Sequence, residues 1–133
     1  MTHIFMQKAG YTVVDEFRSG PFLVEYGYAP DTTQLELLFD PSEDYYQELV
    51  EKIADGTWEH FIARVRVLYD GREMASEYLG SVVHEDPAVW FEQDEDGSVD
   101  DMVQTAMDAA RTEAMNMLEI LKKDFLGVDT ASK

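Results

Sequence analysis

The dipeptide Asp70-Gly71 constrains this fold more than any other stretch, because it predicts a tight turn between two β-rich segments. A two-residue type I′ turn needs positive φ at both central residues, and Asp-Gly is one of the pairs that suit it best. Apolar residues alternate with polar ones before the dipeptide, as is typical of a half-buried strand. We therefore predict a β-hairpin over residues 58–84.

The same turn predicts a strand register, because a two-residue loop fixes which residues lie opposite each other. Tyr69 lies opposite Arg72, and Arg64 lies opposite Glu77 as a cross-strand ion pair. The apolar side of the first strand shares one face with four residues of the second, so that Phe61, Ala63, Val65 and Val67 face Gly80, Tyr78, Ser76 and Met74.

A long amphipathic helix is predicted over residues 98–124. Ser98 is a suitable N-cap, and the two aspartates that follow in the first turn favour the positive end of the helix dipole. Met107 and Met115 lie off the main apolar stripe and form a candidate contact surface, so a homodimer is an open interpretation. The stripe itself recurs at helical spacing through Val99, Val103, Ala106, Ala110, Met117, Leu121 and Phe125.

The remaining elements are shorter. Period-two alternation and turn residues predict strands at 11–17, 22–28 and 35–39 within a β-rich N-terminal part, residues 1–40. Apolar spacing predicts a helix over 42–55, and the apolar run 88–91 is interpreted as one more strand. The chain is thus expected to form a single domain, 1–133, of α+β class. Its mostly antiparallel sheet, built from two hairpins, is expected to pack against two helices on one face.

The net charge of the chain limits the classes of partner that it can bind. Ten basic and 28 acidic residues give a net charge of −18, which repels nucleic acid and anionic membranes and attracts basic proteins. We therefore predict no direct binding to nucleic acid and no membrane association. The N-terminal residues lack the apolar run of a signal peptide or a membrane span, which predicts a cytoplasmic protein.

Catalytic and metal-binding patterns have little support in the residues. The chain has no cysteine, and no serine lies in a nucleophile-elbow context. His60 and His84 could approach each other across the hairpin, but a metal site needs more converging ligands. The acidic run from Glu92 resembles a calcium loop, yet the twelfth position, where an EF-hand needs glutamate, is Val103. We predict no enzymatic activity, no cofactor and no metal site.

Several short motifs stand in the second half of the chain, namely Ala63-Arg64-Val65, Asp70-Gly71, Glu73, Ala75-Ser76, Leu79-Gly80, Asp101-Met102-Val103 and Ala110-Arg111. Through them, residues 58–125 resemble a group of uncharacterised small acidic proteins of bacteria and their mobile elements. These are mostly turn and packing residues, so the resemblance implies no catalytic residue. It implies a place in phage or mobile-element biology.

Acidic residues are the feature that indicates a function. Carboxylates three or four positions apart on a helix lie about 5–6 Å apart at Cβ, comparable to neighbouring phosphates along a nucleic-acid strand. The candidate partner-binding residues are Glu43, Asp44, Glu48, Glu51, Asp55, Glu85, Asp86, Glu92, Asp94, Glu95, Asp96, Asp100 and Asp101.

These residues predict a small inhibitor that presents carboxylates in place of phosphates. Its partner would be a basic or nucleic-acid-binding protein, for example a phage-defence nuclease or a CRISPR effector. Two alternatives stay open. One is an immunity or antitoxin-like partner of a basic toxin, and the other is a general acidic domain of halophilic type, whose charge serves hydration.

Overall fold

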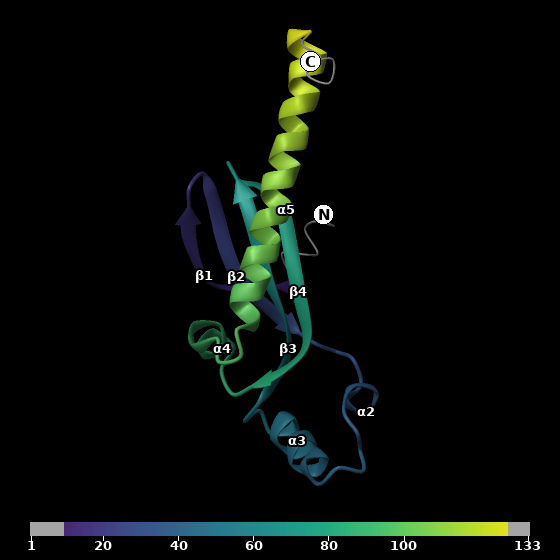
Figure 1. Cartoon of the computed structure of the whole chain (residues 1–133). Helices are drawn as coiled ribbons and strands as arrows, with labels where there is room; N and C mark the ends of the chain where they lie inside the picture. Colours follow the sequence, from purple (N-terminus) through teal and green to yellow (C-terminus); the bar gives the residue numbers. More distant parts are fainter. Residues whose placement is uncertain (1–9, 128–133) are drawn as a thin grey trace.

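The computed structural model describes residues 10–127, which form a four-stranded antiparallel sheet with helices (Figure 1). The strands are β1 (Thr12–Ser19), β2 (Phe22–Pro30), β3 (Glu59–Tyr69) and β4 (Arg72–His84). Their order in the sheet is the order in the chain, so β1 and β2 form one hairpin and β3 and β4 the other. The predicted α+β class is confirmed.

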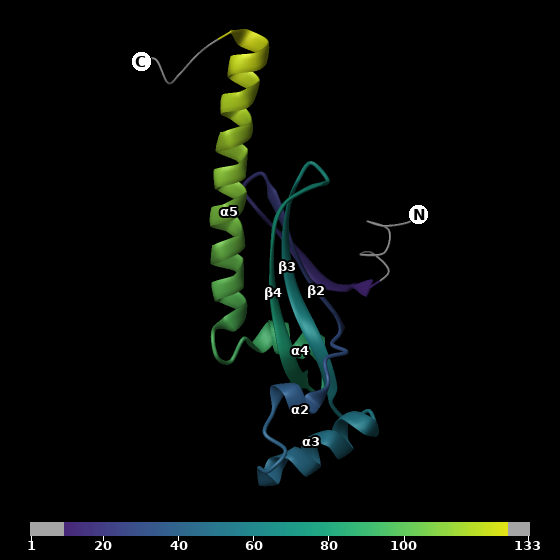
Figure 2. The same ribbon diagram turned by 90° about the vertical axis from the view of Figure 1, so that its right-hand side faces the viewer.

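Four helices and a short π-helical end complete the described part. Helices α2 (Leu35–Leu38) and α3 (Asp44–Ala54) connect β2 to β3 and lie beyond the ends of the strands (Figures 1 and 2). Helix α4 (Pro87–Gln93) leads into α5 (Ser98–Leu121), which continues as the π-helix η1 (Lys122–Leu126). The long helix α5 runs along one face of the sheet and projects past the hairpin turns at the ends of the strands (Figure 2). The sequence predicted that the helix over residues 42–55 would lie beside the long helix on this face. In the structure, α4 lies there instead.

The core lies between α5 and the sheet. From β3, Phe61, Val65 and Val67 are fully buried, and Ala106 and Ala110 of α5 are as well, because their small side chains let the helix approach the strands closely. Met107 belongs to this core with an exposed fraction of 4%, so the predicted contact surface was wrong at that position. Met115, by contrast, is 59% exposed.

The Asp70-Gly71 turn is confirmed, but the predicted register beyond it is wrong. Tyr69 pairs with Arg72 as expected. A β-bulge then places Met74 as an extra residue in β4, because Glu73 pairs with Leu68 and Ala75 already pairs with Val67. Val65 consequently faces Glu77, and Arg64 faces Tyr78 instead of Glu77. A second irregularity pairs Phe61 with Val82, and Ala63 pairs with Leu79 rather than with Tyr78.

Two short apolar runs form helices where strands were expected. Residues 35–39 close a single turn, in which the Phe39 N–H donates to the Leu35 carbonyl. Residues 88–91 lie in α4, where Asp86 accepts a hydrogen bond from the Ala88 N–H at 3.0 Å and Pro87 suits the first helical position. Periodicity cannot distinguish a buried strand from a helix over so few residues.

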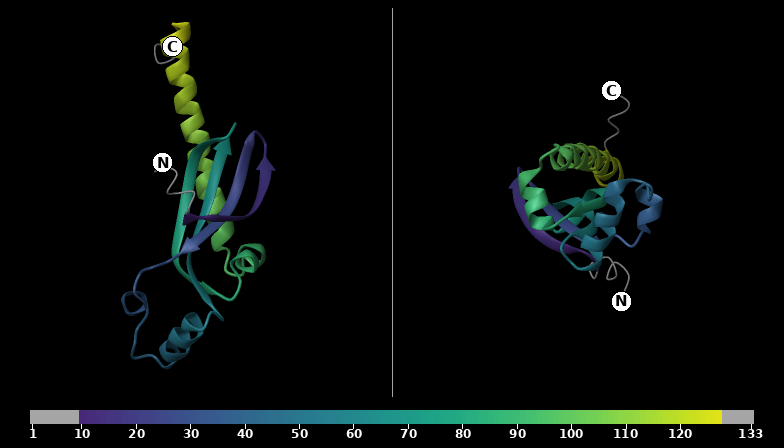
Figure 3. Two further views of the ribbon diagram at one scale, coloured as in Figure 1. Left: turned by 180° about the vertical axis from the view of Figure 1, so that it is seen from behind. Right: turned by 90° about the horizontal axis from the view of Figure 1, so that it is seen from below.

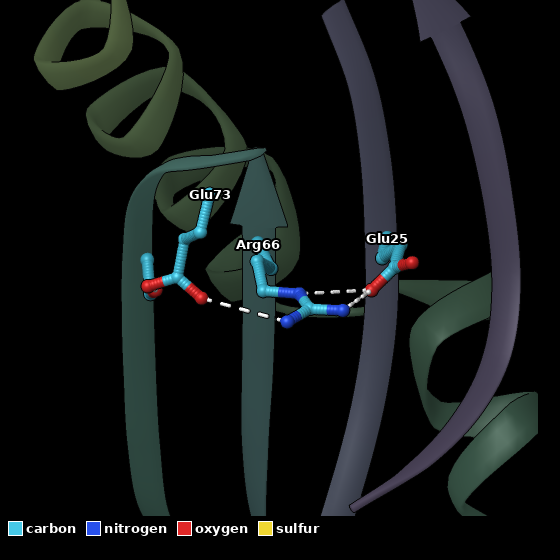
Figure 4. A network of polar contacts seen from close by, with 4 residues as sticks. Glu25, Arg66 and Glu73 are labelled. Carbon is cyan, nitrogen blue, oxygen red and sulfur yellow. Dashed lines mark hydrogen bonds and ion pairs between the residues drawn. The ribbon is translucent and has the colours of Figure 1, made fainter. Parts of the chain in front are cut away.

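No described helix covers the other face of the sheet (Figure 3, left). On this face Arg66 donates two hydrogen bonds to Glu25 Oε1, at 3.0 and 2.8 Å, and lies 3.6 Å from Glu73 (Figure 4). Arg64 is buried beside it, with its guanidinium 4.2 Å from the centre of the Tyr11 ring. Burial, together with the nearby charge of Arg66, lowers the pKa of Arg64. This network connects β2, β3 and β4.

Replacing Arg66 with alanine is expected to lower the free energy of unfolding by about 1–3 kcal/mol, because Glu25 would lose both of its charge-assisted hydrogen bonds. The Glu25 side chain is only 13% exposed, so water cannot fully replace them. Urea unfolding of Arg66→Ala, Glu25→Ala and the double variant measures the coupling. Strictly additive losses would show that the pair contributes nothing.

Among residues 10–127, no helix combines the length and the apolar character that a membrane span requires.

Candidate acidic binding surface

The negative charge is concentrated at one end of the molecule. Residues 31–59 and 84–101 contain 17 of the 28 acidic residues and one of the ten basic ones, Lys52, which leaves them a net −16 of the total −18. These two segments comprise α2, α3, α4 and the start of α5, all of which lie at the same end (Figure 1). We call this region the acidic end.

Helix α3 carries the most regular group of carboxylates. Asp44, Glu48, Glu51 and Asp55 follow one another at intervals of four, three and four residues, which places them on one side of the helix. At 1.5 Å per residue they are spaced about 4.5–6 Å apart along the axis. Leu49 on the opposite side is buried, so the stripe of carboxylates faces away from the packed surface.

Two hollows lie at the end of β4, one beside Leu49 of α3 and the other beside the α4–α5 corner. Both are lined by Val83 and His84. Figure 3 (right) shows α4 on one side of the strand ends and α2 and α3 on the other. The first hollow, of about 450 Å³, adds Leu49, Trp58 and Glu85, and the second, of about 240 Å³, adds Trp90, Gln93, Glu95 and Asp96.

Asp94 and Asp96 have a structural role that the sequence analysis missed. The Asp94 carboxylate accepts hydrogen bonds from the backbone N–H groups of Val99 and Asp100, at 2.8 and 3.0 Å, and Asp96 accepts one from Ser98 at 3.0 Å. Gly97, with a φ of 79°, occupies the N-cap position expected for Ser98. The first turn of α5 is therefore capped by a side chain from the preceding loop.

Asp86 caps α4 in the same way by accepting from the Ala88 N–H, and Asp55 accepts from the Thr57 N–H in the turn that follows α3. The nine other predicted carboxylates are exposed and make no hydrogen bond or ion pair within residues 10–127. They belong to Glu43, Asp44, Glu48, Glu51, Glu85, Glu92, Glu95, Asp100 and Asp101. All four predicted carboxylates that accept backbone hydrogen bonds belong to aspartates, whose short side chains reach nearby N–H groups. These nine carboxylates are free to meet a partner.

Local hydrogen bonds lower the pKa of two of these aspartates. The Thr57 hydroxyl and N–H lower the pKa of Asp55, and the Ser98 hydroxyl and N–H lower the pKa of Asp96. Donors to the charged form of a carboxyl stabilise that form. Both carboxyls are therefore easier to ionise than a free aspartate side chain.

A third hollow, of about 430 Å³, lies between the first hairpin and α5. Phe17, Tyr26, Val103 and Met107 provide apolar lining, and Glu92, Asp94 and Asp100 are among its polar residues. Burial, and then the nearby Asp94, Asp15 and Asp100 carboxylates, raise the pKa of the Tyr26 hydroxyl. Arg111 of α5 also lines this hollow, so a long cationic side chain of the protein itself already lies beside these carboxylates.

The two hairpin histidines do not form a common site. His60 pairs with Val83 and His84 with Glu59, so their side chains leave opposite faces of the sheet. His60 Nε2 lies 3.4 Å from the buried Asp31, whereas His84 Nδ1 accepts a hydrogen bond from the Asp86 N–H. Over residues 10–127, no three His, Asp or Glu side chains are grouped so as to hold a metal ion.

Asp31 is a buried carboxylate that the sequence analysis did not single out. Burial opposes its ionisation, but N–H groups of Ser81 and Thr33 donate to it, and the net effect lowers the pKa of Asp31. Ser81 has a φ of +61°, unusual for a residue with a side chain, within the second irregularity of β4. Asp31 thus stabilises this distorted segment, a role that no local sequence signal reveals.

Replacing Asp94 with alanine is expected to lower the free energy of unfolding by about 1–2 kcal/mol, because two N–H groups at the start of α5 lose their acceptor. Glu95→Ala is the matched control, since its carboxylate accepts no hydrogen bond in the described chain. We expect a change below about 0.5 kcal/mol for the control. Equal effects in urea unfolding would contradict the capping role.

No model of a known protein family, no curated protein and no solved structure matches this chain. The geometry and charge of the acidic end are therefore the features that bear on its function.

Proposed function

We propose that this protein is a small acidic inhibitor that binds a basic, nucleic-acid-handling protein, such as a phage-defence nuclease, and presents carboxylates in place of phosphates. The observation that supports this proposal most is the polarity of the molecule, by which we mean the concentration of its negative charge at one end. The acidic end holds a net −16, with nine carboxylates that have no partner within the described chain. Such a field attracts and orients a basic groove before contact.

The polarity also separates this proposal from the halophilic alternative. A charge that serves only hydration needs no particular place on the surface. Outside the acidic end, the chain holds 11 acidic and nine basic residues, a net charge of −2. A general adaptation to salt gives no reason for this difference, whereas a binding surface does.

The carboxylate stripe of α3 supports the mimicry of a nucleic-acid strand. Asp44, Glu48, Glu51 and Asp55 lie on one helical side at near-regular spacing. A helix holds such charges in fixed positions, so a basic groove meets them without ordering a flexible segment. Lysine and arginine side chains of the groove would contact them as they contact phosphates.

An immunity-like partner of a basic toxin is the second candidate. It is favoured by the hollow around Leu49, Trp58 and Val83, where apolar side chains lie beside Glu85. Protein interfaces commonly combine an apolar centre that contains aromatic residues with a polar rim. In this case the target would be held partly by apolar contacts, and nucleic acid would not displace the protein.

Affinity capture with three baits tests the proposal. The first bait is the wild type, and the second carries Glu85→Gln, Glu92→Gln and Glu95→Gln, three residues that line the hollows. Asp94 and Asp96 are left intact because they cap α5. The third bait carries Glu16→Gln, Asp70→Asn and Glu113→Gln, and both triple variants change the net charge from −18 to −15.

From a nuclease-treated lysate, we expect the wild type and the third bait to retain the same basic protein, which the second bait loses. DNA or RNA added to the column should release that protein. Equal retention on all three baits would contradict a role for Glu85, Glu92 and Glu95, and retention in the presence of excess nucleic acid would favour the immunity-like alternative.

A further inference from the structure

The distal part of α5 carries an apolar stripe that the sheet does not cover. Residues that pack on the sheet, such as Ala106 and Ala110, are fully buried. The same side of the helix continues past the hairpin turns (Figure 2), and there Leu121 is 48% exposed and Phe125 is 77% exposed. We call this region the distal stripe, and its members are Ala114, Met117, Leu118, Leu121 and Phe125.

These positions follow helical spacing. The intervals between Ala110, Ala114, Met117 and Leu121 are four, three and four residues, the pattern of a helix that packs along another helix. Leu118 and Phe125 lie beside this seam, and both are exposed. A partner helix would cover all of them at once.

The charge of this segment differs from that of the opposite end. Residues 111–126 contain three basic and three acidic residues, so their net charge is zero. A basic partner is attracted to the acidic end, which carries a net −16, and gains nothing comparable at the distal stripe. A second copy of this chain, itself at −18, meets the least repulsion where the local charge is balanced.

We propose that the distal stripe pairs with the distal stripe of a second copy to form an antiparallel homodimer. Two-fold symmetry makes such an interface self-complementary, with the same apolar residues on both sides. Antiparallel pairing places the two acidic ends at opposite extremes of the dimer. Parallel pairing would bring them side by side, where their like charges repel.

Sedimentation velocity measures the mass of the dimer and its interface. At about 100 µM and physiological salt, the molecular mass measured for the wild type should be twice the 15.2 kDa of one chain. Leu121→Asp introduces a charge into the distal stripe at an exposed position, and should sediment as a monomer. Asn116→Asp, on the opposite side of α5, adds the same charge and should remain dimeric. A monomeric wild type, or a dimeric Leu121→Asp variant, would overturn the proposal.

Cysteine cross-linking determines the orientation, because the chain has no cysteine of its own. Single cysteines at positions 114, 118, 121 and 125 are oxidised separately. In an antiparallel pair only a position near the two-fold axis lies close to its own copy, so one or two neighbouring variants should form disulfide-linked dimers. Efficient cross-linking at all four positions would show a parallel pair and contradict the antiparallel arrangement.

Discussion

Replacing Phe61 with alanine is expected to lower the free energy of unfolding by about 3–5 kcal/mol, the largest stability loss of the changes considered. Phe61 is fully buried on β3, and its ring lies edge-on to Tyr28 of β2 and to Trp90 of α4, at 5.7 and 5.8 Å between centres. The side chain therefore connects the sheet to the helix that leads into α5. Its removal leaves a cavity that three elements would have to close.

Urea unfolding followed by circular dichroism measures this loss. Phe61→Leu retains most of the apolar volume and is expected to cost less than half as much, which keeps the comparison meaningful if the alanine variant does not fold. Phe125→Ala is the matched control, because the same truncation at a 77% exposed position should change stability by less than about 1 kcal/mol at low micromolar protein concentration. Similar losses at positions 61 and 125 would contradict the assignment of the core.

Neutralising the carboxylate stripe of α3 is expected to slow binding to the target about tenfold at low ionic strength. The variant carries Asp44→Asn, Glu48→Gln and Glu51→Gln, and it leaves in place Asp55, which accepts a hydrogen bond from the Thr57 N–H. Charges of this kind chiefly accelerate association, and salt screens them over about 10 Å at 0.1 M. The difference from the wild type should therefore shrink strongly in 0.5 M salt.

Surface plasmon resonance with the captured target checks this prediction. The remote triple variant, Glu16→Gln, Asp70→Asn and Glu113→Gln, has the same net charge of −15 and should slow association less than threefold. An equal effect of the two triple variants would mean that net charge matters and its position does not. Unchanged rates for both would exclude the α3 stripe from the interface.

Elements with strong local signals could be predicted from the sequence. The Asp70-Gly71 turn, both hairpins and the long helix all appear, since each depends on neighbouring residues. The runs 35–39 and 88–91 were assigned wrongly because four or five apolar residues fit a strand and a helix equally well. The bulge at Met74 could not be predicted, since it depends on how β4 packs against β3 and α5.

The candidate site was predicted as a set of residues but not as a surface. Sequence spacing identified the acidic stripe of α3 and the acidic run near α5, whereas their placement at the same end of the molecule depends on the tertiary fold. Sequence reasoning also treated Asp94 as a binding residue. Its capping role requires the left-handed backbone of Asp94 itself, at a φ of 44°, which aspartate adopts only in a favourable context.

Competition between this protein and nucleic acid for the purified target tests the central claim most directly. A fluorescently labelled DNA or RNA oligonucleotide is bound to the target and titrated with the wild-type protein by fluorescence anisotropy. We predict complete displacement, with a midpoint that rises in proportion to the oligonucleotide concentration, and a weaker effect of the variant with Glu85→Gln, Glu92→Gln and Glu95→Gln. A ternary complex, in which the target holds the oligonucleotide and this protein together, would contradict nucleic-acid mimicry.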